Sequence, residues 1–283
     1  MNNEITRIPS GFPMLDILTG GYPEKGLVIA RYLGHEMQAE ILQEFMERQA
    51  LNLALKESPQ SRKTLLCSLQ MSTEETAKDI GMNFARSDKD RKELLQSRLF
   101  ITGQEKDEAI PTSEVFLKNI SRHIRKNKFQ ALIIDAIDTL FPREHGNGAI
   151  SKAINEGFRD IESKNILAGL ERIRTEFRIP VIVTDYGNKL ITTPREKDVI
   201  EIELVEDING TTQANVSIGT ELIKVEDLFG IPQHVGTELI RYAISHYDRY
   251  LRFPESTDRI QALANAGAAI AMQIDDLYKT IQQ

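Results

Sequence analysis

Apolar residues recur along this chain with two different spacings, and the spacing changes from segment to segment. Where they return every three or four positions they predict amphipathic helices, and these segments are residues 39–55, 113–126 and 164–178. Short apolar runs bounded by polar residues predict buried strands, and these runs are residues 63–69, 98–102, 129–135 and 179–184. Strands that alternate with helices predict an α/β fold with a mainly parallel sheet and helices on both faces.

Two local signals refine this outline. Ser72 stands three positions before Glu75, which is the capping-box pattern of a helix that begins there. Apolar and polar residues alternate in residues 199–205 and 213–218, with Asn209-Gly210 between them. This pattern predicts a β-hairpin.

Length and composition are those of an ordinary globular protein with one large domain and a small appendage. The chain has 283 residues, of which 41% are hydrophobic and 27% are charged. We divide it into a core domain, residues 1–228, and a C-terminal helical extension, residues 229–283. No leader-like segment or membrane-length apolar run occurs, so we expect a cytoplasmic protein without membrane contact. The one cysteine, Cys67, lies in an apolar run and is expected to be a buried structural thiol.

The charge balance argues against a protein that binds nucleic acid on its own. Lys and Arg number 35 against 42 Asp and Glu, which gives a formal net charge of −7, whereas nucleic-acid binding usually leaves a basic footprint. Basic residues at 122–128 and 172–174 lie in segments with helical apolar spacing, and we interpret them as solvated helix faces. Nucleic acid is therefore expected only within an assembly. The five histidines show no metal-ligand spacing, so we predict no metal and no cofactor.

The N-terminal segment resembles the approach to a phosphate-binding loop, but the loop itself departs from the pattern. A working loop reads Gly-x-x-x-x-Gly-Lys-Ser/Thr, because its backbone N–H groups cradle phosphates, its lysine neutralises them and its hydroxyl ligates magnesium. After Gly34, the glycine, lysine and hydroxyl positions hold Glu36, Met37 and Gln38. We interpret these four residues as a vestigial nucleotide site.

The order of the segments is similar to that of the RecA-like ATPase core shared by bacterial replicative hexameric helicases and KaiC-like ATPases. The resemblance covers about residues 5–225. The matching segments are residues 7–16, the turn at residues 68–72, the strand that ends at Asp135, and residues 178–184 leading to Asn188 and Lys189. It implies a RecA-like fold, and it implies that Asp135 is the magnesium-associated acid. On this resemblance Gln70, Asp135, Asn188 and Lys189 belong to the same vestigial nucleotide site.

Other positions differ from what this family carries. Gln70 stands where the helicases have the glutamate that activates the attacking water, and an amide cannot accept that proton. Tyr186 replaces a glutamine linked to sensing nucleotide or DNA, and residues 215–220 carry no basic residue for a neighbour's active site. Asp135 can also be read as a strand-terminal acid that caps the next turn, with Asp138 beside it.

The C-terminal extension carries an apolar seam of 3.5-residue period, the spacing of a helix that packs along its length. Its residues are Ile260, Leu263, Ile270, Ile274, Leu277 and Ile281. Packing on the chain's own core and docking on a second subunit or partner both remain open.

The resulting hypothesis is a RecA-like pseudo-ATPase that acts as an adaptor, loader or structural subunit, with DNA replication or repair as the expected setting. A protein partner or self-assembly is expected. Two alternatives stay open: an ATPase that recruits another cation, such as Lys25, to the phosphates, and a DNA-binding accessory protein of replication or recombination.

Overall fold

The structure is a computed structural model of the chain, described for residues 6–33, 39–54, 62–84, 98–105, 108–141, 149–191, 198–206 and 211–229. Within these residues the centre is an eight-stranded sheet with the order β10-β9-β8-β3-β7-β6-β4-β5. Its strands are β3 (Leu27–Tyr32), β4 (Thr64–Ser68), β5 (Leu99–Thr102), β6 (Ala131–Asp135), β7 (Val181–Asp185), β8 (Val199–Glu206), β9 (Thr212–Ile218) and β10 (Glu221–Val225).

The sheet is mainly parallel. Strand β3 pairs in parallel with β7 and β8, and the parallel pairing continues through β6 and β4 to β5. Strands β9 and β10 extend the other edge by antiparallel pairing. The strands β3, β4, β6 and β7 are buried along their whole length, as expected when helices cover both faces of a parallel sheet.

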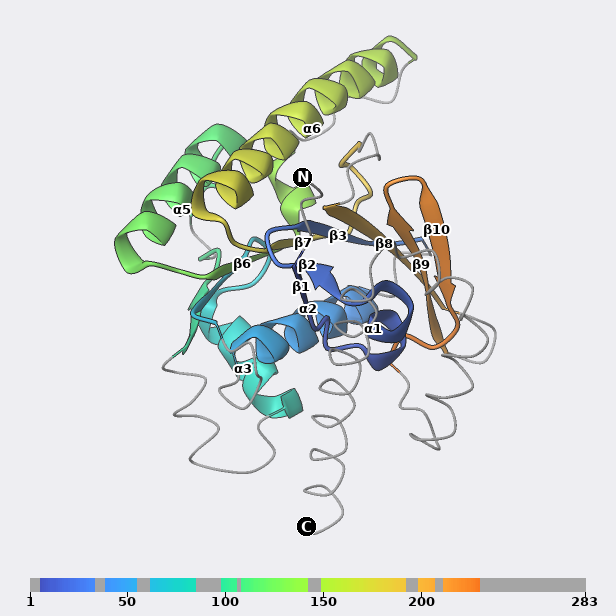
Figure 1. Cartoon of the computed structure of the whole chain (residues 1–283). Helices are drawn as coiled ribbons and strands as arrows, with labels where there is room; N and C mark the ends of the chain where they lie inside the picture. The colour runs from blue at the N-terminus through green and yellow to red at the C-terminus, as the bar shows by residue number, and fades with distance from the viewer. Residues whose placement is uncertain are drawn as a thin grey trace, which may run out of the picture.

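Helices lie on both faces, and this confirms the fold class expected from the sequence (Figure 1). One face carries α1 (Pro13–Thr19), α2 (Ala39–Ala54) and α3 (Thr73–Phe84), and the other carries α5 (Ser113–Asn127) and α6 (Ala149–Phe177). A short 3-10 helix, η2 (Ile137–Leu140), follows β6, and β1 (Arg7–Ile8) pairs with β2 (Tyr22–Pro23) in a separate small sheet.

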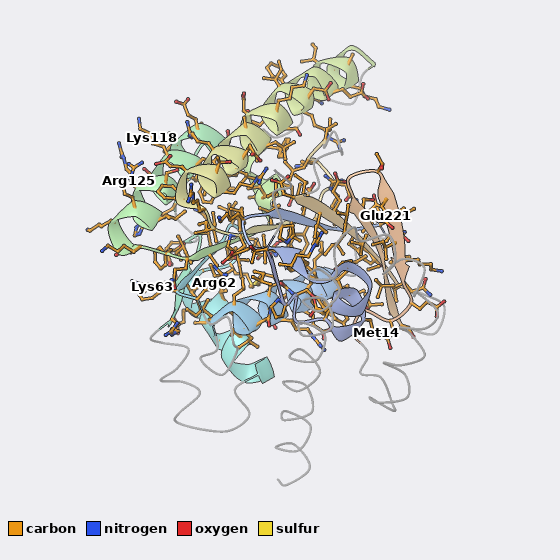
Figure 2. The ribbon with its side chains drawn as sticks, in the orientation of Figure 1. Met14, Arg62, Lys63, Lys118, Arg125 and Glu221 are labelled. Carbon is orange, nitrogen blue, oxygen red and sulfur yellow. The ribbon has the colours of Figure 1, made fainter. Side chains whose placement is uncertain are left out.

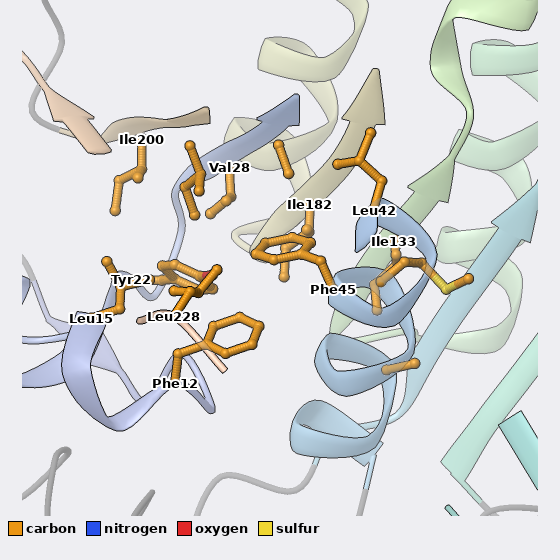
Figure 3. Packing of buried hydrophobic residues seen from close by; sticks show 14 of the residues in the cluster. Phe12, Leu15, Tyr22, Val28, Leu42, Phe45, Ile133, Ile182, Ile200 and Leu228 are labelled. Carbon is orange, nitrogen blue, oxygen red and sulfur yellow. The ribbon is translucent and has the colours of Figure 1, made fainter. Parts of the chain in front are cut away.

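The two faces bury separate apolar clusters. On the α2 face, Phe12 stacks on Phe45 with ring centroids 5.2 Å apart, in the same cluster as Val28 and Ile182 of the sheet (Figure 3). On the α5 and α6 face, Leu117, Ile120 and Ile124 of α5 meet the α6 residues Ile166, Leu170 and Ile173. Burial of this apolar area holds the helices against both faces of the sheet.

The capping box and the hairpin are confirmed. The Ser72 hydroxyl accepts the Glu75 N–H at 3.2 Å, and the Glu75 carboxylate accepts the Ser72 N–H at 3.0 Å. Strands β8 and β9 pair antiparallel, although Asn209 and Gly210 lie outside the described residues.

The structure differs from the outline drawn from the sequence at three points. Helix α6 begins at Ala149, well before residue 164. The sequence did not predict its first half because the apolar residues there are exposed and form no buried stripe. Within residues 113–126, the apolar residue Val115 is 48% exposed, and the buried stripe of α5 consists of Leu117, Ile120 and Ile124. Strand β10 was not predicted from the sequence, since charged residues interrupt its short pattern.

The C-terminal seam lies outside the described residues, so its packing stays a prediction, as does the boundary between residues 1–228 and 229–283. Among the helices described, none combines the length and the apolar character needed to cross a membrane.

Candidate functional site

The candidate site lies where the central parallel strands end. Ser68, Asp135 and Asp185 are the last residues of β4, β6 and β7, and Ser68 is the register partner of Asp135. The carboxyl edge of an open α/β sheet is where ligands usually bind. Four residues predicted from the sequence fall in the described part of this edge: Asp135 ends β6, Gln70 follows β4, and Asn188 and Lys189 follow β7.

Asp135 is fully buried, at 0% exposure, and is surrounded by hydroxyl donors. Its Oδ2 accepts a hydrogen bond from the Ser68 hydroxyl at 3.1 Å. Its Oδ1 accepts two more, from the Thr184 hydroxyl at 2.7 Å and from the Tyr186 hydroxyl at 3.1 Å. Burial raises the pKa of Asp135, the three hydrogen bonds oppose this rise, and the nearby charge of Asp138 adds to it. Protein hydroxyls therefore satisfy both oxygens of this acid.

The phenol of Tyr186 lies against the Asp135 carboxylate. Burial raises the pKa of this phenol, and the Asp135 charge raises that pKa further. The side chain of Gln70, which is exposed, hydrogen bonds to the same phenol. Gln70 stands at the family's glutamate position and Tyr186 at its glutamine position. These two residues thus contact each other.

Asp135 does not cap the next turn, which corrects one reading of the sequence. The Ala136 N–H donates to the Thr184 hydroxyl at 2.9 Å. Asp138 instead accepts the Tyr186 N–H at 3.1 Å. Asp138 therefore stabilises the turn that positions Tyr186. Its hydrogen bond to the backbone gives it a structural role.

Asn188 and Lys189 hold the backbone at the end of β7. The Asn188 amide donates to the Tyr32 carbonyl at 2.9 Å, which ties this turn to the end of β3. The Lys189 N–H donates to Asp185 at 2.9 Å, and its ammonium lies 6.0 Å from the centre of the Phe141 ring. These contacts give both residues a structural role at this edge.

A buried ion cluster lies beside the site, between β3, β7 and β8. The Arg31 guanidinium is 3.5 Å from Asp185 and 3.2 Å from Glu201, and it donates to the Leu190 carbonyl at 3.0 Å. Arg31 and Asp185 are register partners in neighbouring strands. Burial raises the pKa of Asp185, while two backbone N–H donors and the Arg31 charge oppose that rise.

Sequence reasoning missed part of this arrangement. Thr184, Arg31 and Glu201 were not singled out, and Ser68 was noted only as part of a turn. The available signal was a polar or charged residue within or at the end of an apolar strand, as in Ile200-Glu201-Ile202.

The phosphate-loop positions lie between Leu33 and Ala39, outside the described residues. The affected residues are Gly34, Glu36, Met37 and Gln38. Lys25 is described, and it does not support the alternative that it replaces the loop lysine. It immediately precedes Gly26 and β3, so it lies at the opposite edge, about 20 Å from the carboxyl end of that strand.

Comparison with known proteins supports the fold. No protein-family model and no curated protein matches this sequence. Among solved structures, a KaiC-like protein from the hyperthermophilic archaeon Pyrococcus horikoshii matches with a TM-score of 0.51 and 18% sequence identity, over 79% of this chain and 93% of that one. The chain thus has a RecA-like α/β fold, similar to that of a KaiC-like protein.

Proposed function

We propose that the chain is a catalytically inactive RecA-like protein that acts as a structural, adaptor or loader subunit, in a process such as DNA replication or repair. The observation that carries the proposal is the enclosure of Asp135. Its oxygens accept three protein hydroxyl groups, and none of its surface is exposed. An acid that serves magnesium must present an oxygen to the ion or its water shell.

The departures from the family's sequence pattern support the same conclusion, because each affects a separate step of hydrolysis. Met37 removes the charge that neutralises phosphates, Gln38 removes the magnesium hydroxyl, and Gln70 removes the base that activates water. In the structure Gln70 contacts Tyr186. Charge stabilisation and base catalysis are therefore weakened together.

The test is a thermal-unfolding measurement with ATP and magnesium, followed by an assay of phosphate release. We expect no magnesium-dependent rise in melting temperature and no turnover above background. A ligand at about 100 times its dissociation constant would stabilise the fold by about 2.7 kcal/mol, which is readily measured. A magnesium-dependent rise, or turnover that Asp135→Asn abolishes, would support the ATPase alternative.

The adaptor role requires a protein contact surface, and α6 offers one. Its first half presents Ile154, Phe158 and Ile161 with 51%, 58% and 59% of their surface exposed, at helical spacing on one side. Figure 1 shows this half extending beyond the sheet. The described chain ends at Phe229, which packs on Phe12 of the opposite face. We therefore assign the stripe to a second copy of the chain, through its C-terminal seam.

Light scattering of the full chain tests this assignment. Phe158→Asp with Ile161→Asp should lower the assembled mass, and so should Ile270→Asp with Ile274→Asp, while the circular dichroism spectrum stays unchanged. The control is Glu156→Lys with Asp160→Lys, which changes exposed charges on the same half of α6. A monomeric wild-type protein would contradict the assignment, and unfolding of the Ile270/Ile274 variant would place the seam in the chain's own core.

A further inference from the structure

A concavity lies at the opposite edge of the sheet from Asp135. It has a volume of about 500 Å³, and its lining includes the cations Arg62, Arg125, Lys128 and Arg178 and the rings of Phe129 and Phe177. We call it the basic pocket. Its residues precede the starts of β4, β6 and β7, so the length of β6, about 17 Å, separates it from Asp135.

Three separate parts of the chain bring their cations to this pocket. Figure 2 shows Arg125 on α5 and, on the same side of the molecule, Arg62 and Lys63 just before β4. Lys128 follows the end of α5, and Arg178 follows the end of α6. Because these elements are distant in sequence, their meeting is a property of the fold.

The local charge of the basic pocket is positive, in contrast to the net charge of −7 for the chain. Arg62 pairs with Glu24 at 2.9 Å, and Arg125 pairs with Glu176. In the part of the chain that is described, neither Lys128 nor Arg178 has an ion-pair partner. The buried Nε of Arg62 also lacks a hydrogen-bond partner. The Lys128 ammonium and the Arg178 guanidinium therefore remain available to an anion.

Two of these cations have an unfavourable backbone conformation. Lys128 and Arg178 have φ values of 56° and 54°, in the left-handed region. Glycine usually takes this position after a helix, and other residues pay about 1–2 kcal/mol there. Cations also offset the negative end of each helix dipole, but Arg125 and Lys126 in the last turn of α5 and Arg174 in that of α6 already do so.

We propose that the basic pocket binds the phosphate groups of a nucleotide. A phosphate presents several oxygens that can accept hydrogen bonds from Lys128 and Arg178, and guanidinium groups match its geometry. Phe177, which is partly exposed, provides an apolar side of the pocket for the attached nucleoside, and the volume lies in the range of small-molecule sites. The nucleotide is either free or the 5′-phosphorylated end of a single strand. This site is independent of the vestigial site at the carboxyl edge.

Isothermal titration of the full chain, in EDTA at low salt, tests the proposal with three probes: ADP, 5′-phosphorylated dT4 and dT4 with a 5′-hydroxyl. Lys128→Asn with Arg178→Asn removes two charges, and asparagine tolerates positive φ. Lys118→Gln with Arg122→Gln removes the same charge from exposed positions of α5 outside the pocket. We expect ADP or the phosphorylated strand to bind, about tenfold more weakly in the first variant and within about twofold in the control, tenfold being 1.4 kcal/mol.

The outcomes are distinct. Binding of ADP alone identifies a free nucleotide, and preference for the phosphorylated over the hydroxyl strand identifies a strand end. Absence of binding by all three probes, or equal weakening in both variants, overturns the proposal and leaves the pseudo-ATPase reading untouched. Conversely, nucleotide binding that needs magnesium and is lost in Asp135→Asn would contradict the pseudo-ATPase reading and place the ligand at the other edge.

Discussion

Replacing Arg31 with methionine is expected to lower the free energy of unfolding by about 3–5 kcal/mol. The substitution leaves Asp185, which is fully buried, and Glu201, which is nearly so, without their shared cation. Removing one partner of a buried ion cluster is costly because the remaining charges cannot regain their hydration. Urea-induced unfolding followed by circular dichroism measures the loss.

Two comparisons make this result specific. Arg48→Met removes a cation whose helical ion pair with Glu44 is partly exposed, and it should cost less than about 1 kcal/mol. The loss of unfolding free energy caused by Arg31→Met should also be smaller at pH 5 than at pH 8. Burial raises the pKa of Asp185, and protonation removes the unpaired charge that the substitution leaves. Equal, small losses for both variants would show that Arg31 is not part of a buried cluster.

Stability should fall as the pH rises toward neutrality, and Asp16 should be a main cause. Burial raises the pKa of Asp16 from 3.8 to about 7, against hydrogen bonds from Ser10 and Gly11. Its Oδ2 has no hydrogen-bond partner. Between about pH 4 and pH 7 the folded state keeps a proton that the unfolded state has lost, so the free energy of unfolding falls by up to about 4 kcal/mol.

The variant Asp16→Asn isolates this contribution. A neutral amide keeps the acceptor for the Ser10 N–H, which lies 2.8 Å from the carboxylate, and it does not titrate. The variant should gain stability relative to the wild type as the pH rises from 5 to 8, measured by urea midpoints. Asp160→Asn on the exposed face of α6 should track the wild type. If the Asp16 variant also tracks the wild type, Asp16 is ionised in the fold.

The sequence predicted much of the fold because the buried elements follow its apolar spacing. Helix α2 and strands β4 and β6 lie within two residues of their expected bounds, since both faces of the sheet must bury apolar side chains. The first half of α6 could not be predicted in this way. Its apolar residues are exposed, so their positions record no contact with the core.

The candidate site was predictable only in part. Asp135 and Gln70 were found because they follow strands at positions the family resemblance marks. The partners of Asp135 and Arg31 were not found, because they depend on strand order: β7 lies between β3 and β6, which brings Thr184 and Tyr186 to Asp135. Sequence spacing does not encode that order. The interpretation of Glu36, Met37 and Gln38 remains a prediction.

The central claim is that Asp135 does not serve a metal–nucleotide complex, and Mn²⁺ tests it most directly, since it favours the same oxygen ligands as Mg²⁺. Electron paramagnetic resonance would follow free Mn²⁺ during titration of the full chain with Mn²⁺ and a non-hydrolysable ATP analogue. The account predicts the same free Mn²⁺ signal for the wild type and for Asp135→Asn. Immobilised Mn²⁺ that requires the nucleotide and disappears in Asp135→Asn would contradict it.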